Sequence, residues 1–401
     1  MHNEFVRVLN SLSDLNILRI LNLIWRAKKI SRIEIASILK MDKSTVTKII
    51  SRLEQKNLVQ ETAFGESLPQ GGRKRIFLEI NGSFACVGGI HINTEQMIVC
   101  LADLRGTILF ESVQKIDEDE YAKNGFSGIL QDGIKLLQKN AERMRISIAG
   151  IGLGVPGIVD IENKKIIQSI PLLIEKPFDI AQAASEILDV PFFLENDARC
   201  CCYAERIGNK LKPSKNFMYV FIEHRRLHPI KNSPKNISVG FGFASKEKIF
   251  HGANSCMGEF RSIFWSETSS SQFSLATQNI QNLESEEARK IFVELGKNVA
   301  FLANTLSLEL VFVGGIEKHL SENLVDIIHK ESERLWPYEW NKAKSIESAN
   351  ITTHAVSYGA MMMVLDKIFS VPDFPARENL AYYEDDSELL FRQKSEFLRD
   401  I

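Results

Sequence analysis

The 401-residue chain, with 44% apolar and 25% charged side chains, has the composition of a globular protein and is too long for one compact core, so we expect two or three domains. No run approaches the 18 apolar residues of a membrane span, and the N-terminus lacks a signal-peptide core, which favours a cytoplasmic protein. Residues 1–80 carry 14 Lys and Arg against 8 Asp and Glu, whereas the remainder carries 35 against 43. A basic first domain before an acidic remainder indicates that one end faces nucleic acid.

A helix-turn-helix is predicted near the N-terminus. Residues 13–27 have dense apolar periodicity and form a first helix, and residues 30–56 have the pattern of two helices around a tight turn at 41–42. Ser31 is the candidate N-cap of the first of these two helices. The second begins near Lys43, and its apolar residues recur at the spacing of one buried face: Val46, Ile49, Ile50 and Leu53.

The other face of this second helix carries hydroxyl side chains first and cations behind them: Ser44, Thr45, Thr47, Lys48, Arg52 and Lys56. Such a face suits a helix whose leading end reaches base edges in the major groove while its flanks contact phosphates. The alternative is an ordinary helical hairpin with a solvated basic face.

A β-hairpin is predicted directly after the helices. Residues 58–63 and 75–80 have the character of strands, and a polar loop with Gly and Pro separates them. Helix, turn, helix, hairpin is the element order of a winged helix. Arg73 and Lys74 stand at the tip or base of the wing, where positive charge can reach a backbone or a minor groove. The candidate DNA-binding residues are therefore Lys43, Ser44, Thr45, Thr47, Lys48, Arg52, Arg73 and Lys74.

An α/β architecture is predicted for the rest of the chain. Three strands form an antiparallel meander at 85–92, 96–103 and 107–115. Helices and strands then alternate, which favours a mixed sheet. The expected helices are 125–143, 179–188, 197–211, 284–307, 318–334 and 358–369. The expected strands are 147–157, 192–194, 217–222, 237–245, 310–313 and 351–354. Residues 225–236 and 266–282 are expected to be loops, and the tail beyond residue 371 has a weak helical stripe.

Three adjacent cysteines, Cys200, Cys201 and Cys202, raise the possibility of a metal or redox site. Consecutive residues on a helix point about 100° apart, so three neighbours cannot easily share one tetrahedral ion. Small buried side chains are the favoured explanation.

Six segments in order resemble the ROK family, which groups sugar-responsive repressors, unassigned reading frames and sugar kinases. They are GGRKRIFLEIN at 71–81, VGGIHI at 87–92, GIGLGVPGIVD at 150–160, ENDAR at 195–199, VGFGFASKEKIFHGAN at 239–254 and VFVGGI at 311–316. The resemblance extends from about residue 13 to 369, and the winged helix in front resembles the repressor branch.

The resemblance implies an α/β fold with an N-terminal winged helix-turn-helix followed by a two-lobed, actin-like fold of the sugar-kinase ATPase type. The expected division is a DNA-binding domain at 1–80, ROK lobe 1 at 81–196, ROK lobe 2 at 197–371 and a C-terminal tail at 372–401. The implied partners are double-stranded operator DNA, a sugar effector in the cleft, and further copies of the chain in a homodimer or tetramer.

The family's functional residues are only partly retained. Asn196 and Asp197 match the sugar-binding Asn and the catalytic Asp of the kinases, and Glu259 matches a sugar-contacting Glu. Gly154 and Gly240 lie where the backbone is expected to approach a ligand. Each also has a structural explanation, because Asp197 and Asn196 suit a helix start, Glu259 a loop, and the glycines a turn.

Catalysis and metal binding are not expected. The stretch 90–94 matches the kinases' phosphate loop but lacks its acidic residue and glycine pair, so Asp197 is at most a vestigial catalytic residue. Ser262 replaces the family's zinc-binding His, and no cysteine occurs between 263 and 282. We therefore expect no zinc and no cofactor, and a looser cleft wall in which Glu267 is a candidate substitute for a further sugar-binding Glu.

The favoured hypothesis is a DNA-binding regulator, a repressor rather than an enzyme, that responds to a sugar or sugar-derived ligand. A sugar kinase with an added DNA-binding domain is the rival, which Asp197 keeps open. A third possibility is a regulator that has lost sugar sensing and uses its C-terminal part for dimerisation.

Overall fold

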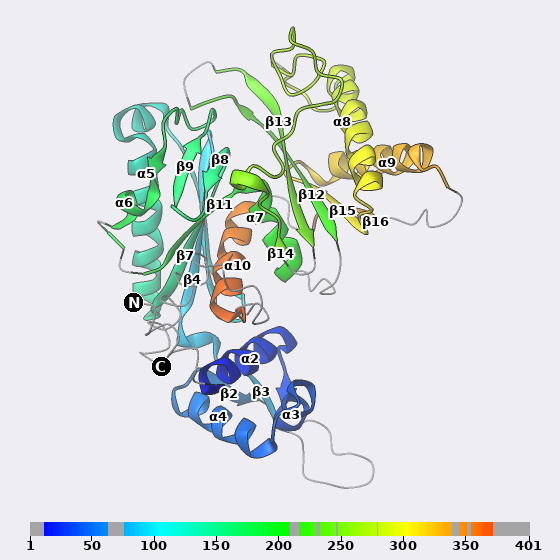
Figure 1. Ribbon diagram of the computed structural model, residues 1–401. Helices are drawn as coiled ribbons and strands as arrows, with labels where there is room; N and C mark the ends of the chain where they lie inside the picture. Colours follow the sequence, from blue (N-terminus) through cyan, green and yellow to red (C-terminus); the bar gives the residue numbers. More distant parts are fainter. Residues whose placement is uncertain are drawn as a thin grey trace.

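A computed structural model describes residues 12–62, 76–185, 187–188, 190–208, 216–229, 233–245, 248–278, 280–338, 345–350 and 354–371. The chain forms a small N-terminal domain below a larger body, and helices lie between the two larger sheets of that body (Figure 1). The described part of the body contains two five-stranded sheets and one three-stranded sheet. None of the helices in this part of the chain combines the length and apolar character needed to cross a bilayer.

The N-terminal domain is a winged helix. Its elements are α2 (Leu12–Ala27), β1 (Ile30–Ser31), α3 (Arg32–Leu39), α4 (Lys43–Gln55), β2 (Val59–Thr62) and β3 (Phe77–Ile80). The three short strands form an antiparallel sheet in the order β1-β3-β2. Strand β1 is only two residues long, and a pairing this short leaves no pattern in the sequence. The loop between β2 and β3, with the predicted Arg73 and Lys74, lies outside the described residues.

Local signals set the limits of α3. Ser31 accepts a hydrogen bond from the Glu34 backbone N–H, and the Glu34 carboxylate accepts one from the Ser31 backbone N–H, which together form the capping box. Lys40 ends the helix in the left-handed conformation with φ 51°. The predicted N-cap is therefore confirmed.

The first sheet of the body has the strand order β11-β7-β4-β5-β6. Its strands are β4 (Cys86–Ile92), β5 (Gln96–Asp103), β6 (Ile108–Lys115), β7 (Ile148–Val155) and β11 (Phe192–Asn196). The meander β4-β5-β6 is antiparallel, and β7 and β11 are added in parallel. A short 3-10 turn, η1 (Gly82–Phe84), leads into this sheet from the winged helix. Beside it lie α5 (Glu118–Met144), α6 (Ile180–Ser185) and the small sheet of β8 (Ile158–Asp160), β9 (Lys165–Gln168) and β10 (Phe178–Asp179).

The second sheet has the order β14-β13-β12-β15-β16. Its strands are β12 (Phe217–Arg226), β13 (Lys235–Ser245), β14 (Lys248–Ile249), β15 (Leu310–Gly314) and β16 (Ser345–Ser348). The helices of this half are α7 (Asp197–Tyr203), which continues as the π-helical turn η2 (Ala204–Gly208), then α8 (Glu286–Thr305), α9 (Lys318–Leu335) and α10 (Ala355–Phe369). A 3-10 turn, η3 (Ala253–Ser255), follows β14.

Successive side chains of each strand point to opposite faces of its sheet, so helices can pack against both faces. On β12, Met218 and Val220 pack with α8 and α9, whereas Phe217 and Tyr219 face the cluster that contains α7 and α10. On β4, Ile90 packs with α5 on the opposite side from α10. Helices α7 and α10 are thus enclosed between the two sheets (Figure 1).

Four predictions for individual elements need correction. Helix α5 begins at Glu118 rather than 125, because Gly125, with φ 60°, interrupts the helix without ending it. The expected loop at 225–236 is largely strand, since β12 and β13 pair as far as Arg226 and Lys235. The expected helix at 197–211 is α-helical only to Tyr203. The edge strand of the second sheet is β16, which was not predicted, whereas 351–353 lie outside the described residues.

Candidate DNA interface and ligand cleft

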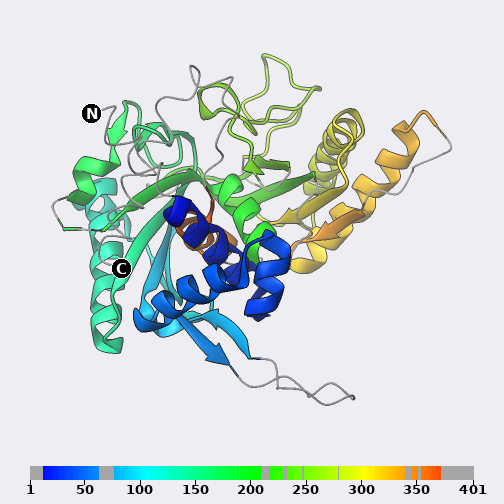
Figure 2. The ribbon, with the colours of Figure 1, turned by 60° about the horizontal axis from the view of Figure 1, so that its bottom comes forward.

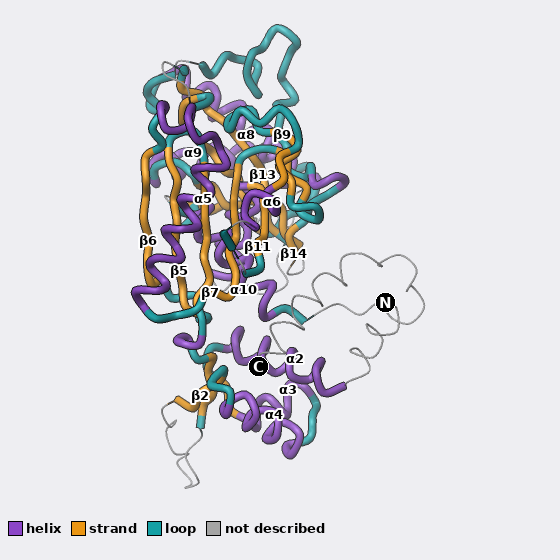
Figure 3. Tube along the Cα trace, turned by 90° about the vertical axis from the view of Figure 1, so that its left-hand side faces the viewer, coloured by secondary structure: helices purple, strands orange, loops and turns teal. Residues whose placement is uncertain are grey.

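Helix α4 is amphipathic in the way its sequence predicts. Val46, Ile50 and Leu53 are buried in the winged-helix core, and Ile49 packs partly against it. Both Figure 1 and Figure 3 draw α2 between α4 and the body, so α4 lies on the side of the winged helix that faces away from the rest of the molecule. The predicted DNA-contacting residues on this helix are exposed, except for a half-buried Thr45: Lys43, Ser44, Thr45, Thr47, Lys48 and Arg52.

Some polar groups near this face already form hydrogen bonds or ion pairs within the domain. The Thr47 hydroxyl donates to the Lys43 carbonyl at 2.8 Å, so its oxygen remains as an acceptor. Arg32, the first residue of α3, pairs with Glu54 at 2.7 Å and Glu61 at 2.8 Å, which compensates its charge within the domain. Seen with the lower side of the molecule turned forward, α4 lies across the front and the wing strands extend beside it (Figure 2).

Asn196 and Asp197 lie at the junction of β11 and α7. The Asn196 side chain caps α7 by accepting from the Arg199 backbone N–H at 3.3 Å, and it donates to the Gly157 carbonyl at 3.1 Å. Asp197 is 6% exposed, and its carboxylate accepts from the Ala198 N–H at 2.7 Å. Asn196 therefore performs the capping role suggested by its position and also holds the β7–β8 turn beside Asp197.

Buried charges surround Asp197. Burial and the nearby Glu223 carboxylate raise the pKa of Asp197 to about 7, against the opposing effect of Arg225. Glu223 and Arg225 lie on the same face of β12 and form a buried ion pair, and burial also raises the pKa of Glu223. Sequence analysis missed both residues because it ended the strand at 222. Their alternation along β12 was the signal that could have revealed them.

A second buried ion pair anchors the loop that leads to Glu259. Arg199 on α7 contacts the Glu195 carboxylate at 2.7 Å and donates to the carbonyls of Ser255 at 2.9 Å and Met257 at 3.1 Å. Burial opposes ionisation of Glu195, but Arg199 and His251, whose Nε2 lies 2.7 Å away, outweigh it and lower the pKa of Glu195 to about 2. The loop is thereby fixed to the helix that carries Asp197.

The candidate ligand residues converge, with one exception. Gly240 forms an antiparallel bridge with Glu259, and a Cβ on Gly240 would meet only Ala198, at 3.2 Å. Glu259 is exposed and is close enough to Asp197 to raise its pKa. Gly154 differs, because a Cβ there would lie 2.5 Å from Val356 on α10 and 2.9 Å from the Cys200 sulfur on α7. Helix packing accounts for that glycine.

Hydrogen bonds join the two lobes beside Glu223. The Asn93 amide donates to Glu223 at 3.4 Å, the Thr94 hydroxyl donates to the Arg226 carbonyl at 2.9 Å, and the Arg226 backbone N–H donates to Glu95 at 3.0 Å. We call these five residues the interlobe clasp. They connect the β4–β5 turn of the first sheet to β12 of the second.

Comparison with known families identifies both parts of the chain. Residues 87–261 match the ROK family model, and residues 15–63 match the MarR family model. The chain carries a ROK-family domain behind a MarR-like winged helix. The observed order of a winged helix and then a body with helices enclosed between two five-stranded sheets agrees with this assignment.

The curated relatives compared here are named as repressors. The chain is 26% identical over 250 residues to the xylose repressor of Caldicellulosiruptor bescii, covering 62% of this chain and 58% of that protein. It is 27% identical over 238 residues to the xylose repressor of Bacillus spizizenii, covering 59% and 56%. It is 23% identical over 234 residues to the DNA-binding transcriptional repressor Mlc of Escherichia coli, covering 57% and 53%. The matches thus span little more than half the length of these relatives.

Solved structures confirm the fold class. A ROK family transcriptional regulator, described as a homolog of E. coli Mlc, aligns with a TM-score of 0.65 at 16% identity, covering 88% of this chain and 96% of that one. The ROK family glucokinase from Streptomyces griseus, in complex with glucose and AMPPNP, aligns with a TM-score of 0.53 at 16% identity, covering 70% and 99%. The N-terminal winged helix followed by the two-lobed, actin-like ROK fold is therefore as predicted.

The segment of the ROK body that follows Glu259 is held by side chains rather than left loose. Ser262 accepts from the Asn298 amide at 3.1 Å and from the Phe264 N–H at 3.1 Å. The Gln272 amide bonds both backbone groups of Val239 at 2.8 Å, and Phe273 is fully buried. Sequence analysis expected a looser wall, whereas this network anchors the segment to α8 and β13. Among the described residues, no group of three His, Cys, Asp or Glu side chains is arranged to hold a metal ion.

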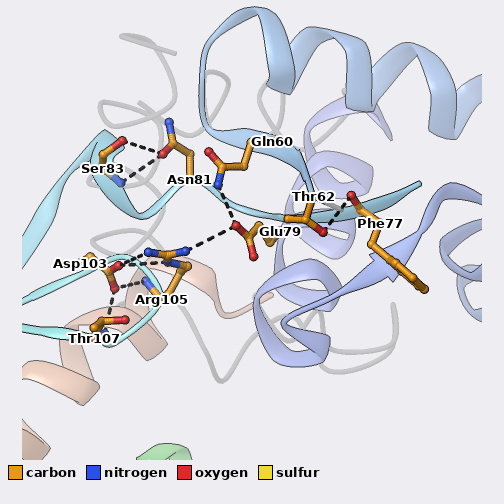
Figure 4. A network of polar contacts seen from close by, with 9 residues as sticks. All are labelled: Gln60, Thr62, Phe77, Glu79, Asn81, Ser83, Asp103, Arg105 and Thr107. Atoms are coloured by element: carbon orange, nitrogen blue, oxygen red, sulfur yellow. Dashed lines mark hydrogen bonds and ion pairs between the residues drawn. The ribbon is translucent and has the colours of Figure 1, made fainter. Parts of the chain in front are cut away.

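Among the described residues, two sets of side-chain contacts connect the winged helix with the ROK body. Trp25 of α2 stacks on Phe369 at the end of α10, and the Asn22 amide donates to the Phe369 carbonyl at 2.9 Å. At the second contact, Glu79 on β3 accepts from Gln60 at 2.7 Å and pairs with Arg105 of the β5–β6 turn at 3.4 Å (Figure 4). The backbone and side chain of Arg105 bond Asp103, which fixes the turn (Figure 4).

Proposed function

We propose that this protein is a DNA-binding transcriptional repressor whose kinase-like body detects a sugar instead of phosphorylating it. The observation that carries the proposal is the exposed face of α4, on which hydroxyl side chains precede Lys48 and Arg52 on the side away from the body. The named relatives support it, because all three compared above are repressors. The DNA contacts are assigned to Lys43, Ser44, Thr45, Thr47, Lys48 and Arg52, with Arg73 and Lys74 on the wing loop.

The cleft residues Asn196, Asp197 and Glu259 are assigned to the effector, with Gly240 as part of the backbone wall. Two of the relatives are named xylose repressors, so a pentose is among the candidate effectors. The Asp197 and Glu259 carboxylates can accept hydrogen bonds from the hydroxyl groups of a sugar, and binding of this kind requires no reaction. Asp197 then has a binding role where a kinase would use it as a general base.

The interlobe clasp argues against phosphoryl transfer. A kinase must leave the polar groups of its phosphate loop free for the nucleotide. Here the side chains of Asn93 and Thr94 are already bonded to the second lobe. A metal ion that stabilised the transferred phosphate would need a carboxylate beside this turn that is free of ion pairs. Glu223, a carboxylate beside the turn, is instead paired with Arg225.

Helix α10 supplies the connection between cleft and DNA interface. It packs on β4, β7 and α7, and its last residue, Phe369, contacts α2. The buried side chains of the winged helix, α7 and α10 form one continuous apolar cluster. A sugar that favours one position of α7 therefore shifts the equilibrium between DNA-competent and DNA-incompetent arrangements, provided that its affinity for the two differs. A homodimer or tetramer in the cytoplasm would set the spacing of two half-sites.

Two assays test the proposal with the full chain. Duplexes selected from a random pool are titrated by fluorescence anisotropy with and without a panel of sugars, and we expect sequence preference and a sugar-dependent change in affinity. ATP consumption is measured in parallel over the same panel. Turnover that Asp197→Asn abolishes would overturn the proposal in favour of the kinase, and the absence of any preference over random duplex would remove the DNA-binding function.

A further inference from the structure

Strand β6 forms an open edge of the first sheet in the part of the chain that the structure describes. It pairs with β5 on one side, and Figure 3 draws it at the outer margin of the sheet. Three large apolar side chains of this strand are exposed, by 42% for Ile108, 39% for Leu109 and 46% for Val113, and the strand contains no proline. Proteins usually protect a sheet edge with charges or proline, because an open strand pairs with other chains. The apolar character of β6 therefore suits it to pairing with another strand.

The phase of the β5–β6 pairing determines which backbone groups of β6 face outwards. The Ile116 N–H donates to the Glu95 carbonyl at 2.9 Å, so the backbone of residue 116 faces β5. Backbone groups alternate along an antiparallel strand, so those of Glu111, Val113 and Lys115 face away from β5. Among the described residues, no backbone hydrogen bond uses these outward groups. They are donors and acceptors that a further strand can bind.

The side chains of the same three residues lie on one face of the strand and carry complementary charges. In antiparallel pairing about a two-fold axis through Val113, that residue lies opposite its own copy, and Glu111 lies opposite Lys115 of the second copy on both sides of the axis. Opposite charges directly across a strand pair stabilise the pairing, and like charges destabilise it. Registers centred on Glu111 or Lys115 place like charges opposite each other, and those centred on residues 112 or 114 do not pair Glu111 with Lys115. The charges therefore select the register centred on Val113.

We propose that β6 is an interface between two copies of this chain, joined edge to edge in the register centred on Val113. Each outward-facing pair in this register can exchange two backbone hydrogen bonds, and the two first sheets become one continuous sheet. Glu111 contacts His354 through Oε1, which leaves Oε2 for a lysine of the second copy. Lys115 forms no ion pair among the described residues, so the contact gives this lysine a carboxylate partner.

This pairing places the two winged helices at opposite ends of the joined sheet. Antiparallel pairing reverses the direction of β6, and in each copy the winged helix contacts the β5–β6 turn through Glu79 and Arg105 (Figure 4). Two winged helices placed in this way do not lie side by side on one operator, so the β6 contact links chains that bind separate duplexes. This consequence rests on the proposed DNA-binding function, whereas the edge pairing itself does not.

A charge swap tests the register. Sedimentation of the full chain over a range of concentrations measures its association. We expect Lys115→Glu, which places two carboxylates opposite each other on both sides of the axis, to weaken association at least about tenfold. Adding Glu111→Lys restores opposite charges, and association should return to within a few-fold of the native chain, which a misfolded variant could not do. Lys139→Glu, at an exposed lysine of α5, is the matched control and should leave association unchanged.

Cysteine cross-linking tests the position of the axis. In a chain whose exposed Cys256 is replaced by serine, Val113→Cys should give a disulfide-linked dimer under mild oxidation, because the two copies of residue 113 lie opposite each other. Leu109→Cys is also exposed on the same strand, but its two copies lie on opposite sides of the axis, so it should not cross-link.

Three results would overturn the proposal. They are a chain that stays monomeric at every concentration, association that Lys115→Glu leaves unchanged, and cross-linking of Leu109→Cys but not of Val113→Cys. Protection of the outward β6 amides from hydrogen exchange in a monomer would also overturn it, because another segment of the same chain would then cover the edge. Capture of a labelled duplex by a bead-bound duplex, lost in Lys115→Glu, tests the link between two DNA molecules. Edge pairing without any DNA binding would support the interface and remove the proposed function instead.

Discussion

The indole ring of Trp25 stacks on the phenyl ring of Phe369, with 5.1 Å between the ring centroids and 18° between the planes. These residues are 344 positions apart, in the first described helix and the last, so the two ends of the described fold meet here. The stack is an apolar contact between α2 of the winged helix and α10, which packs against α7 in the body. The polar contact through Glu79 and Arg105 is partly exposed and contributes little to stability on its own.

Replacing Trp25 with alanine should uncouple the DNA-binding domain from the cleft. The stack contributes about 0.5–1.5 kcal/mol beyond its apolar area, and its loss frees α2 to move without α10. We expect DNA affinity without sugar to stay within a few-fold, whereas the sugar-dependent change in affinity falls towards none. Anisotropy titrations with and without the bound sugar measure both. Trp25→Phe, which keeps an aromatic ring, is the control, and a full sugar response in Trp25→Ala would show that the signal takes another route.

Thr94→Val tests the interlobe clasp. Thr94 is fully buried, and the substitution keeps its shape while leaving the Arg226 carbonyl without the donated hydrogen bond. We expect the free energy of unfolding to fall by about 1–3 kcal/mol and hydrogen exchange to increase at the β4–β5 turn and along β12. Thr62→Val is the matched control, because its weak 3.5 Å bond lies at the wing. Similar exchange in both variants would mean that the clasp does not hold the lobes together.

The sequence predicts the winged helix well because its determinants are local. Ser31 with Glu34, and the spacing of Val46, Ile50 and Leu53, specify the turn and the buried face without reference to distant residues. The glycine-rich segments and ENDAR at 195–199 resemble the ROK family, and that resemblance predicts the two-lobed fold. In contrast, β1 and β16 exist only through pairing with β3 and β15, and strands this short carry no periodicity of their own.

The charged cluster of the cleft is the main feature that the sequence does not reveal. Arg225 falls in a stretch with Pro, Asn and Lys that is typical of a loop, yet antiparallel pairing with Asn236 buries it beside Glu223. Asn93 and Thr94 of the first lobe bond Glu223 and Arg226, which lie 130 and 132 residues further along the chain. Only the packing of one lobe against the other brings these groups together, so no local pattern could predict them.

Asp197→Asn should stabilise the protein at alkaline pH. The folded pKa of Asp197 is raised to about 7, above the value near 3.9 expected of the unfolded chain. Between these values the folded state binds more protons, so the contribution of this group to stability falls as pH rises towards 7 and is lowest above it. We expect the variant to be more stable than the native chain at pH 8, by on the order of a few kcal/mol. The difference should shrink as the pH falls from 7 to 4.

Urea titrations of both chains at several pH values measure that difference. Glu195→Gln is the control, because the depressed pKa of its carboxylate, about 2, lies below this range. That variant should therefore be less stable than the native chain by a nearly constant amount from pH 8 to about 5. A constant difference between native and Asp197→Asn proteins across this range would show that Asp197 does not titrate near neutrality.

Lys48→Ala is expected to weaken binding to all duplexes alike, because an exposed lysine behind the leading end of α4 contacts phosphates rather than bases. The slope of log affinity against log salt should fall by about 1, in contrast to Thr45→Ala, which should alter base preference. Lys139→Ala on α5, which removes an exposed charge outside the winged helix, is the control. Anisotropy at four salt concentrations separates the cases. An unchanged slope for Lys48→Ala, or an equal change for Lys139→Ala, would place the DNA on another surface, since counterion release registers only phosphates that the protein contacts.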